Sequence, residues 1–194
     1  AVIRVDSSVI IGSGHVMRCL NLADMLNEKG VVVRFVCRDY PGNLIEIIKQ
    51  RGYNCDTLEF KDKELYQKQS INDNYAKWLH VSQEQDAKET VECLSSLNID
   101  LLVIDHYSLD ITWEQQLRKH VKKIMVIDDL ANRIHDCDYL LDQNYFANAQ
   151  LRYAGKLPVK CIQMLRPEFA LINPKFLQIL NARRNLGKLE CTHI

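Results

Sequence analysis

The sequence predicts an α/β fold in which parallel β-strands are joined by crossover helices. Short β-branched runs alternate with helical stretches from the first residue onwards. Two apolar runs, "DLLVID" and "KIMVID", have the continuous hydrophobic character of central parallel strands, and each ends in aspartate. A chain of 194 residues that is 47% hydrophobic can bury the core of a single folded unit.

The first third of the chain alternates strand and helix. "AVIRV" predicts a strand, and residues 15–29 predict a helix because their apolar side chains recur at helical spacing. "VVVRFV" predicts the second strand, residues 43–51 the second helix and "CDTLEF" a third strand. The polar residues 61–74 that follow are interpreted as a surface excursion.

The rest of the chain continues the pattern without a repeat, a low-complexity segment or a clear linker. A helix is expected within 75–97, and the apolar runs "DLLVID" and "KIMVID" predict strands with a helix over 110–120 between them. "YLLDQ" and "KCIQML" predict two more strands, and a closing helix is expected from about residue 174.

Composition excludes several classes of protein. Lysine plus arginine equals aspartate plus glutamate at 25 each, and no long basic block favours a nucleic-acid or membrane partner. Seven cysteines without a CxxC pair indicate free thiols in a reducing, cytoplasmic compartment. The chain begins without a signal peptide's apolar region, and no apolar run approaches the roughly 18 residues that cross a bilayer. No histidine or cysteine spacing suggests a metal site, and no cofactor is expected.

The stretch "IGSGHVMRCL" carries the first candidate site, because two glycines precede a histidine where the first strand gives way to the first helix. In an open parallel sheet this turn is the usual anion site, and glycine permits positive φ and close approach of a ligand. The spacing is GxGH rather than GxGxxG, with Arg18 where a third dinucleotide glycine would stand. The alternative is that Gly12 and Gly14 only form a tight turn and that His15 caps the helix.

Polar residues at the other strand ends are predicted to lie on the same edge of the sheet as His15, because parallel strands end together. Such convergence favours a site, although aspartate after a strand also commonly caps a helix or forms a turn. Tyr107, Trp78 and Trp113 are expected to pack more readily than to stack on a ligand. The strand-end residues are Asp6, Asp105, His106, Asp128, Asp129 and Asn144.

Four segments, taken together, resemble a known family. "RVDSSVIIGSGHVMRCLNLADML", "WLHVSQEQDAKET", "VIDHYSLDITWEQQLR" and "IDDLANRIHDCDYLLDQN" are similar in order and spacing to the UDP-2,4-diacetamido-2,4,6-trideoxy-beta-L-altropyranose hydrolases of pseudaminic acid biosynthesis. That family is related to glycosyltransferase-B enzymes, in which two Rossmann-like domains face each other across a cleft. The resemblance covers nearly all of this chain but about the first half of such an enzyme.

The resemblance implies a Rossmann-like parallel sheet with helices on both faces, one half of a glycosyltransferase-B type fold. Residues 1–183 are then expected to form the N-terminal catalytic domain. Residues 184–194 are expected to be a tail toward a missing C-terminal domain that binds most of the UDP.

The resemblance also implies a reaction. Water attacks the anomeric carbon of a UDP-linked diacetamido sugar with inversion, releasing UDP and 2,4-diacetamido-2,4,6-trideoxy-L-altrose. His15 would be the base, and the unperturbed imidazole pKa of about 6.5 suits that task. Asp6 is a candidate to orient His15 or bind the sugar, and Arg18 to hold charge near the site. The expected substrate-binding residues are Asp6, Gly12, Gly14, Arg18, Asp105, His106, Tyr107, Asp128 and Asn144.

Two other functions remain open. A sugar transferase of the same fold would use a sugar or lipid hydroxyl in place of water, and an isolated domain would act only as a binding module.

The chain departs from the family pattern near its end. The family's "GPxYALLRPEF" appears here as "RPEFALINPKF", so that Arg166 replaces a glycine, Phe169 a tyrosine, Asn173 an arginine and Lys175 a glutamate. His80 also stands where glycine is expected. These differences concern the domain junction more than the predicted catalytic edge.

Overall fold

A computed structural model describes residues 1–61, 75–95, 97–173 and 176. In chain order the elements are β1 (Val2–Val5), α1 (Gly14–Glu28), β2 (Arg34–Arg38), α2 (Ile45–Gln50), β3 (Asn54–Leu58), the 3₁₀ helix η1 (Tyr75–Leu79), α4 (Gln83–Leu94), β4 (Ile99–Asp105), α5 (Ile111–Leu117), β5 (Val121–Ile127), β6 (Tyr139–Asp142), α6 (Ala149–Arg152), β7 (Ile162–Leu165) and the 3₁₀ helix η2 (Pro167–Phe169).

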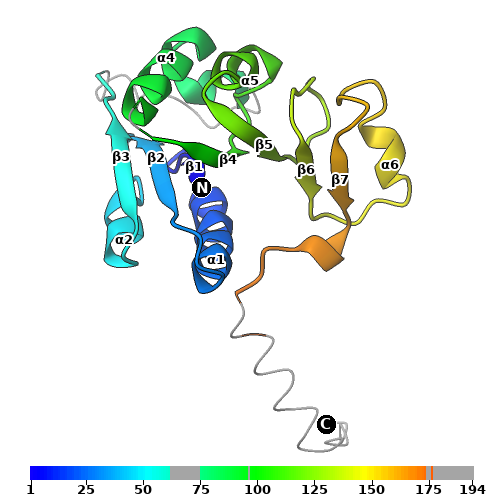
Figure 1. Cartoon of the computed structure of the whole chain (residues 1–194), viewed down its shortest axis with the longest axis horizontal. Helices are drawn as coiled ribbons and strands as arrows, with labels where there is room; N and C mark the ends of the chain where they lie inside the picture. The colour runs from blue at the N-terminus through cyan, green and yellow to red at the C-terminus, as the bar shows by residue number, and fades with distance from the viewer. Residues whose placement is uncertain (62–74, 96, 174–175, 177–194) are drawn as a thin grey trace, which may run out of the picture.

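Within these residues, one seven-stranded sheet has the order β3-β2-β1-β4-β5-β6-β7 (Figure 1). Every neighbouring pair of strands is parallel. From β1, the strands β2 and β3 follow toward one edge of the sheet, whereas β4 lies on the other side of β1 and β5, β6 and β7 follow toward the opposite edge. This order is the Rossmann arrangement. The predicted α/β class and Rossmann-like parallel sheet are confirmed.

Helices cover both faces of the sheet, with α1 and α2 on one side and α4 and α5 on the other (Figure 1). The alternation of side chains along each strand divides the core accordingly. On β4, Leu102 and Ile104 join the apolar cluster that includes Trp113 of α5, whereas Val103 joins the cluster that includes Val16 of α1. The sheet is thus the middle of three layers.

A buried ion network fixes α4 to the sheet. Arg4 of β1 donates to Asp6 at 2.6 and 2.8 Å and to Asp86 of α4 at 2.7 and 3.1 Å, and all three residues are fully buried. Asp86 also accepts from Arg38 of β2 at 2.7 Å and from the Trp113 indole at 2.9 Å. Each buried charge therefore has an opposite partner, as burial requires.

The helix expected within 75–97 begins later than the sequence pattern suggested. Residues 75–79 form η1, His80 has a φ of 56°, and the Ser82 side chain caps α4 by accepting from the Gln85 amide at 3.1 Å. A capping hydroxyl after a left-handed residue ends one helix and starts another. The short α6 was not predicted, and the closing helix, the tail 184–194 and nearly all of 61–74 lie outside the described residues.

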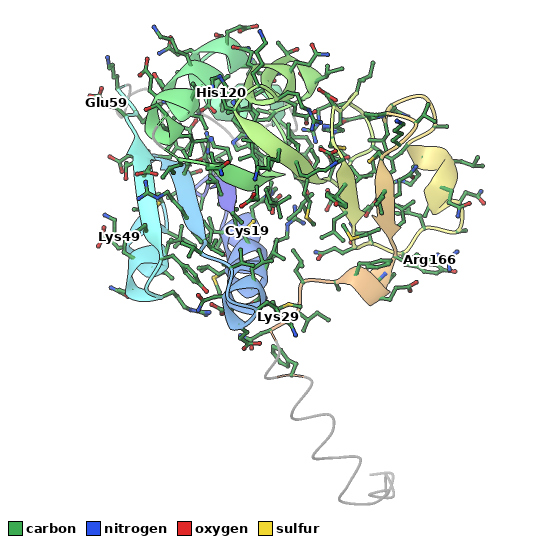
Figure 2. All side chains as sticks on the ribbon, viewed as in Figure 1. Cys19, Lys29, Lys49, Glu59, His120 and Arg166 are labelled. Atoms are coloured by element: carbon green, nitrogen blue, oxygen red, sulfur yellow. The ribbon has the colours of Figure 1, made fainter. Side chains whose placement is uncertain are left out.

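The two positions where the resembled family has or is expected to have glycine both have positive φ. The φ of His80 is 56° and that of Arg166 is 108°. Arg166 follows β7 at the edge of the sheet, away from Cys19 of α1 (Figure 2). A φ of this size with an extended ψ of 164° is adopted almost only by glycine, so the backbone at Arg166 is strained.

In the part of the chain that the structure describes, no helix is long and apolar enough to cross a membrane.

Candidate active site

The candidate site lies at the carboxyl edge of the sheet, where the strand order reverses between β1 and β4. Ligands of open parallel sheets bind outside this reversal, because the loops after the two strands diverge there. His15 lies in the first turn of α1, which follows β1, and Asp105 is the last residue of β4. The topology thus brings together residues 90 positions apart in sequence.

The loop between β1 and α1 is a tight turn. The Ser8 hydroxyl accepts from the amides of Ile10 and Ile11 at 3.1 and 2.8 Å, and the Gly12 amide donates to the Ser8 carbonyl at 2.9 Å. Gly12 has a φ of 80°, so the turn itself accounts for this glycine. Apart from its neighbours along the chain, a Cβ added at Gly12 or Gly14 would meet no atom of the described residues within 4 Å, so these residues leave the surface in front of α1 open.

His15 and Asp105 form a buried hydrogen-bonded pair. The His15 Nδ1 lies 2.7 Å from Asp105 Oδ1, and Asp105 is fully buried. One turn along α1, Arg18 donates to both oxygens of the same carboxylate, each at 2.6 Å. An ionised carboxylate only accepts hydrogen bonds, so Nδ1 carries a hydrogen, and in the neutral ring the lone pair is then on Nε2.

The charges around Asp105 keep it ionised. Burial acts to raise the pKa of Asp105, but the His15 ring and the Arg18 guanidinium outweigh it and hold that pKa well below its usual range. Asp105 therefore orients the imidazole and would stabilise it when protonated. This pairing corrects the expectation that Asp6 orients His15.

Tyr107 and Asp129 extend the site along the same edge. The Tyr107 ring packs edge-on against His15 with the ring centroids 4.6 Å apart, and its hydroxyl donates to Asp129 at 2.5 Å. Asp129 also accepts from Asn144 at 3.2 Å and lies 3.7 Å from Arg18. Burial and Asp129 raise the pKa of Tyr107, so its hydroxyl remains a donor.

Asp6 and His106 lie in the core and not at the site surface. Besides Arg4, Asp6 binds the Arg38 amide at 2.7 Å, and its carboxylate lies 3.2 Å from the His106 Nε2. His106 accepts from the Ser108 amide at 3.0 Å, and burial lowers its pKa. Both residues are at most 4% exposed, so their proposed contact with substrate is not supported by their position.

Asp128 is also fully buried and holds the turn after β5. Its carboxylate accepts from the Ala131 amide at 2.9 Å and from the Tyr153 hydroxyl at 3.1 Å, and it pairs with Arg133. Asp128 thus has the structural role in a turn that the sequence left open as the alternative to a role in the site. The structure therefore does not favour Asp128 as a ligand of the sugar.

The fold brings to the site two residues, Asp129 and Arg133, that are not among the substrate-binding residues predicted from the sequence. Asp129 was noted only as a strand end, yet it connects Tyr107, Arg18 and Asn144. The Arg133 guanidinium lies 5.8 Å from the Tyr107 ring centre, and its buried Nε and Nη1 have no hydrogen-bond partner among the described residues. Arg133 stands inside the quoted segment "IDDLANRIHDCDYLLDQN", the one signal that could have selected it.

No group of three or more histidine, cysteine, aspartate or glutamate side chains within the described residues is placed to hold a metal ion.

Comparison with known proteins gives one informative match. No protein-family model matches the chain. The chain is 30% identical over 186 residues to the UDP-2,4-diacetamido-2,4,6-trideoxy-beta-L-altropyranose hydrolase of Campylobacter jejuni subsp. jejuni serotype O:2, an alignment that covers 95% of this chain and 55% of that protein. The chain thus spans about half the length of the curated relative, and the match confirms the resemblance predicted from the sequence.

Proposed function

We propose that this chain is the catalytic half of a nucleotide-sugar hydrolase of pseudaminic acid biosynthesis, acting on a UDP-linked 2,4-diacetamido-2,4,6-trideoxy sugar. The 2.7 Å contact between His15 Nδ1 and Asp105 is the observation that carries the proposal. It leaves one imidazole nitrogen as a base at the position where this fold class binds ligands. The named relative supplies the substrate class.

In the proposed reaction, His15 Nε2 accepts a proton from water as the water oxygen bonds to the anomeric carbon. The bond from that carbon to the UDP oxygen breaks, UDP leaves as an anion, and the configuration inverts. UDP is a good leaving group, so a second carboxylic acid is less needed than in ordinary glycosidases. Asp105 holds the imidazole and offsets the positive charge that it acquires.

The neighbouring residues have distinct roles in this proposal. Arg18 is committed to Asp105 through two donors and so acts by fixing the base, not by holding UDP. Tyr107 limits rotation of the His15 ring by packing against it. Gly12 and Gly14 leave space for the substrate, and Asn144 is exposed at the rim, where it is proposed to contact the sugar.

The proposal assigns residues 1–183 to the catalytic domain and places most of the UDP site in a second domain reached through 184–194. The relative's length supports this division. Well-held reacting groups have effective molarities of about 10⁵ M or more, so the half without the UDP site loses most of the rate. Calorimetric titration of the chain with UDP should give millimolar binding or none, and micromolar affinity would contradict the division.

The test of the base is His15→Asn in the chain extended by its UDP-binding half, measured as UDP release. Turnover should fall about 10²- to 10⁴-fold with little change in substrate binding. His120→Asn is the matched control, because His120 is exposed beyond α5 on the opposite side of the sheet from Cys19 (Figure 2). Turnover of the His15 variant within tenfold of the parent would remove His15 as the base.

A further inference from the structure

Two aromatic side chains from η1 join Tyr107 beside His15. The ring centroids of Tyr75 and Tyr107 are 5.0 Å apart, those of Trp78 and Tyr107 are 5.8 Å apart, and those of Tyr75 and Trp78 are 4.8 Å apart. Trp78 also lies edge-on to His15 at 6.4 Å. These contacts give the candidate site an aromatic wall, defined as Tyr75, Trp78 and Tyr107.

Hydrogen bonds and apolar packing hold η1 against its neighbours, which include the β1–α1 loop. The Ser108 hydroxyl donates to the Tyr75 carbonyl, and the Tyr40 hydroxyl donates to the Leu79 carbonyl at 2.5 Å. Trp78 packs against a small apolar cluster that includes Ile11 and Tyr40. The wall is therefore anchored at both ends of η1 and presents preformed ring surfaces, which reduces the entropy lost on binding.

Trp78 is less buried than Trp113, the other tryptophan of the chain. Trp113 is fully buried and its indole binds Asp86, so its role is packing. Trp78 and its two partners in the wall are each only partly buried, although they lie against a catalytic candidate. Partly open ring surface at this edge points to contact with a ligand.

The wall faces a site whose other groups are polar. Asp105 and Arg18 place charged groups beside His15, and Asp129 lies next to Arg18, while the wall places ring surface against the same imidazole. An ordinary hexose carries hydroxyl groups that aromatic rings cannot hydrogen-bond well. A sugar with acetamido groups and a deoxygenated C6 has methyl groups that such rings can bury.

We propose that the aromatic wall binds the methyl groups of the sugar and that Trp78 selects acetamido-deoxy sugars over fully hydroxylated ones. This inference rests on the proposed function and adds specificity-determining residues to it. Burial of one methyl group strengthens binding about fourfold, so burial of two or three methyl groups should strengthen binding about tenfold or more.

Saturation-transfer NMR on the chain tests the inference with three probes: free 2,4-diacetamido-2,4,6-trideoxyhexose, N-acetylglucosamine and glucose. Irradiating the aromatic protons should transfer magnetisation to the methyl groups of the first sugar most strongly, and competition should rank its affinity at least tenfold above glucose. Trp78→Ala should reduce this preference to within about threefold, while Trp78→Phe should keep most of it. No transfer to the methyl groups in the folded chain, or an unchanged preference in Trp78→Ala, would overturn the inference.

Binding of free sugars to the chain alone separates this inference from the proposed function, because it needs no turnover. The parent chain should show the preference for the acetamido-deoxy sugar. Phe169→Ala, which removes an exposed aromatic ring near β7, should also retain it and serves as the matched control. If the preference depends on Trp78 but the extended chain releases no UDP from the UDP-linked sugar, the wall stands and the hydrolase proposal fails.

Discussion

Asp105→Asn tests the central electrostatic feature of the site in the chain alone. The substitution keeps the shape of the side chain but removes its charge, and it replaces one accepting oxygen with a donor. That donor then faces either His15 or Arg18, both of which donate to Asp105 in the structure. The pair is disrupted without creating a cavity.

The size of the effect follows from burial. Removing one partner of a buried ion pair costs roughly 3–5 kcal/mol. The Asp105 side chain is fully buried, but that of Arg18 is 13% exposed, so water can partly solvate the guanidinium that loses its partner. We therefore expect a loss at the lower end of this range, about 3 kcal/mol. A domain is stable by roughly 5–15 kcal/mol, so the loss is a large fraction of the total.

The pH dependence has a defined sign. The folded pKa of Asp105 is held below its usual range, whereas the unfolded value is about 3.9. The unfolded state therefore takes up the proton first as pH falls. The stability that Asp105 contributes is fully present above about pH 4 and declines as pH falls toward the folded pKa.

Urea denaturation followed by circular dichroism measures this difference at pH 7, 5 and 3.5. The parent should exceed the variant by about 3 kcal/mol at pH 7 and pH 5, and by less at pH 3.5, with similar m-values. Asp110→Asn is the control, because Asp110 caps α5 and asparagine caps as well as aspartate. A difference below about 1 kcal/mol at pH 7, or one that does not shrink at low pH, would refute the assigned electrostatics.

Two other substitutions test the surrounding fold. Asp86→Asn removes one of the two carboxylates that pair with the fully buried Arg4, so it should lower the free energy of unfolding by roughly 3–5 kcal/mol. The melting temperature should drop by about 10 °C, and a drop of less than about 3 °C would contradict the role given to this network. Arg166→Gly should raise the free energy of unfolding by about 1 kcal/mol, because glycine tolerates a φ of 108°. The exposed Arg166 side chain has no hydrogen bond or ion pair within the described residues, so little is lost with it. A variant that is destabilised in urea denaturation would show that the backbone there is not strained.

The order of strands and helices could be predicted from the sequence, because β-branched runs and helical periodicity are local signals. Their boundaries were less accurate. The helix within 75–97 begins at residue 83 because His80 and Ser82 interrupt it, and neither residue alters the apolar periodicity that predicted the helix. Arg4 in "AVIRV" gave no sign of the ion network, since its partner Asp86 is 82 residues away.

By itself, the sequence determined that His15 and the strand-end aspartates share one edge, because parallel strands must end together. Only the tertiary structure decided which aspartate meets His15. Side chains alternate between the two faces of a strand, so Asp105 follows Val103 onto the face covered by α1, whereas Asp6 follows Arg4 and Asp128 follows Val126 onto the face of α4 and α5. Which helix covers which face depends on packing between distant segments, and that choice gave His15 its carboxylate and placed Asp6 and Asp128 in the core.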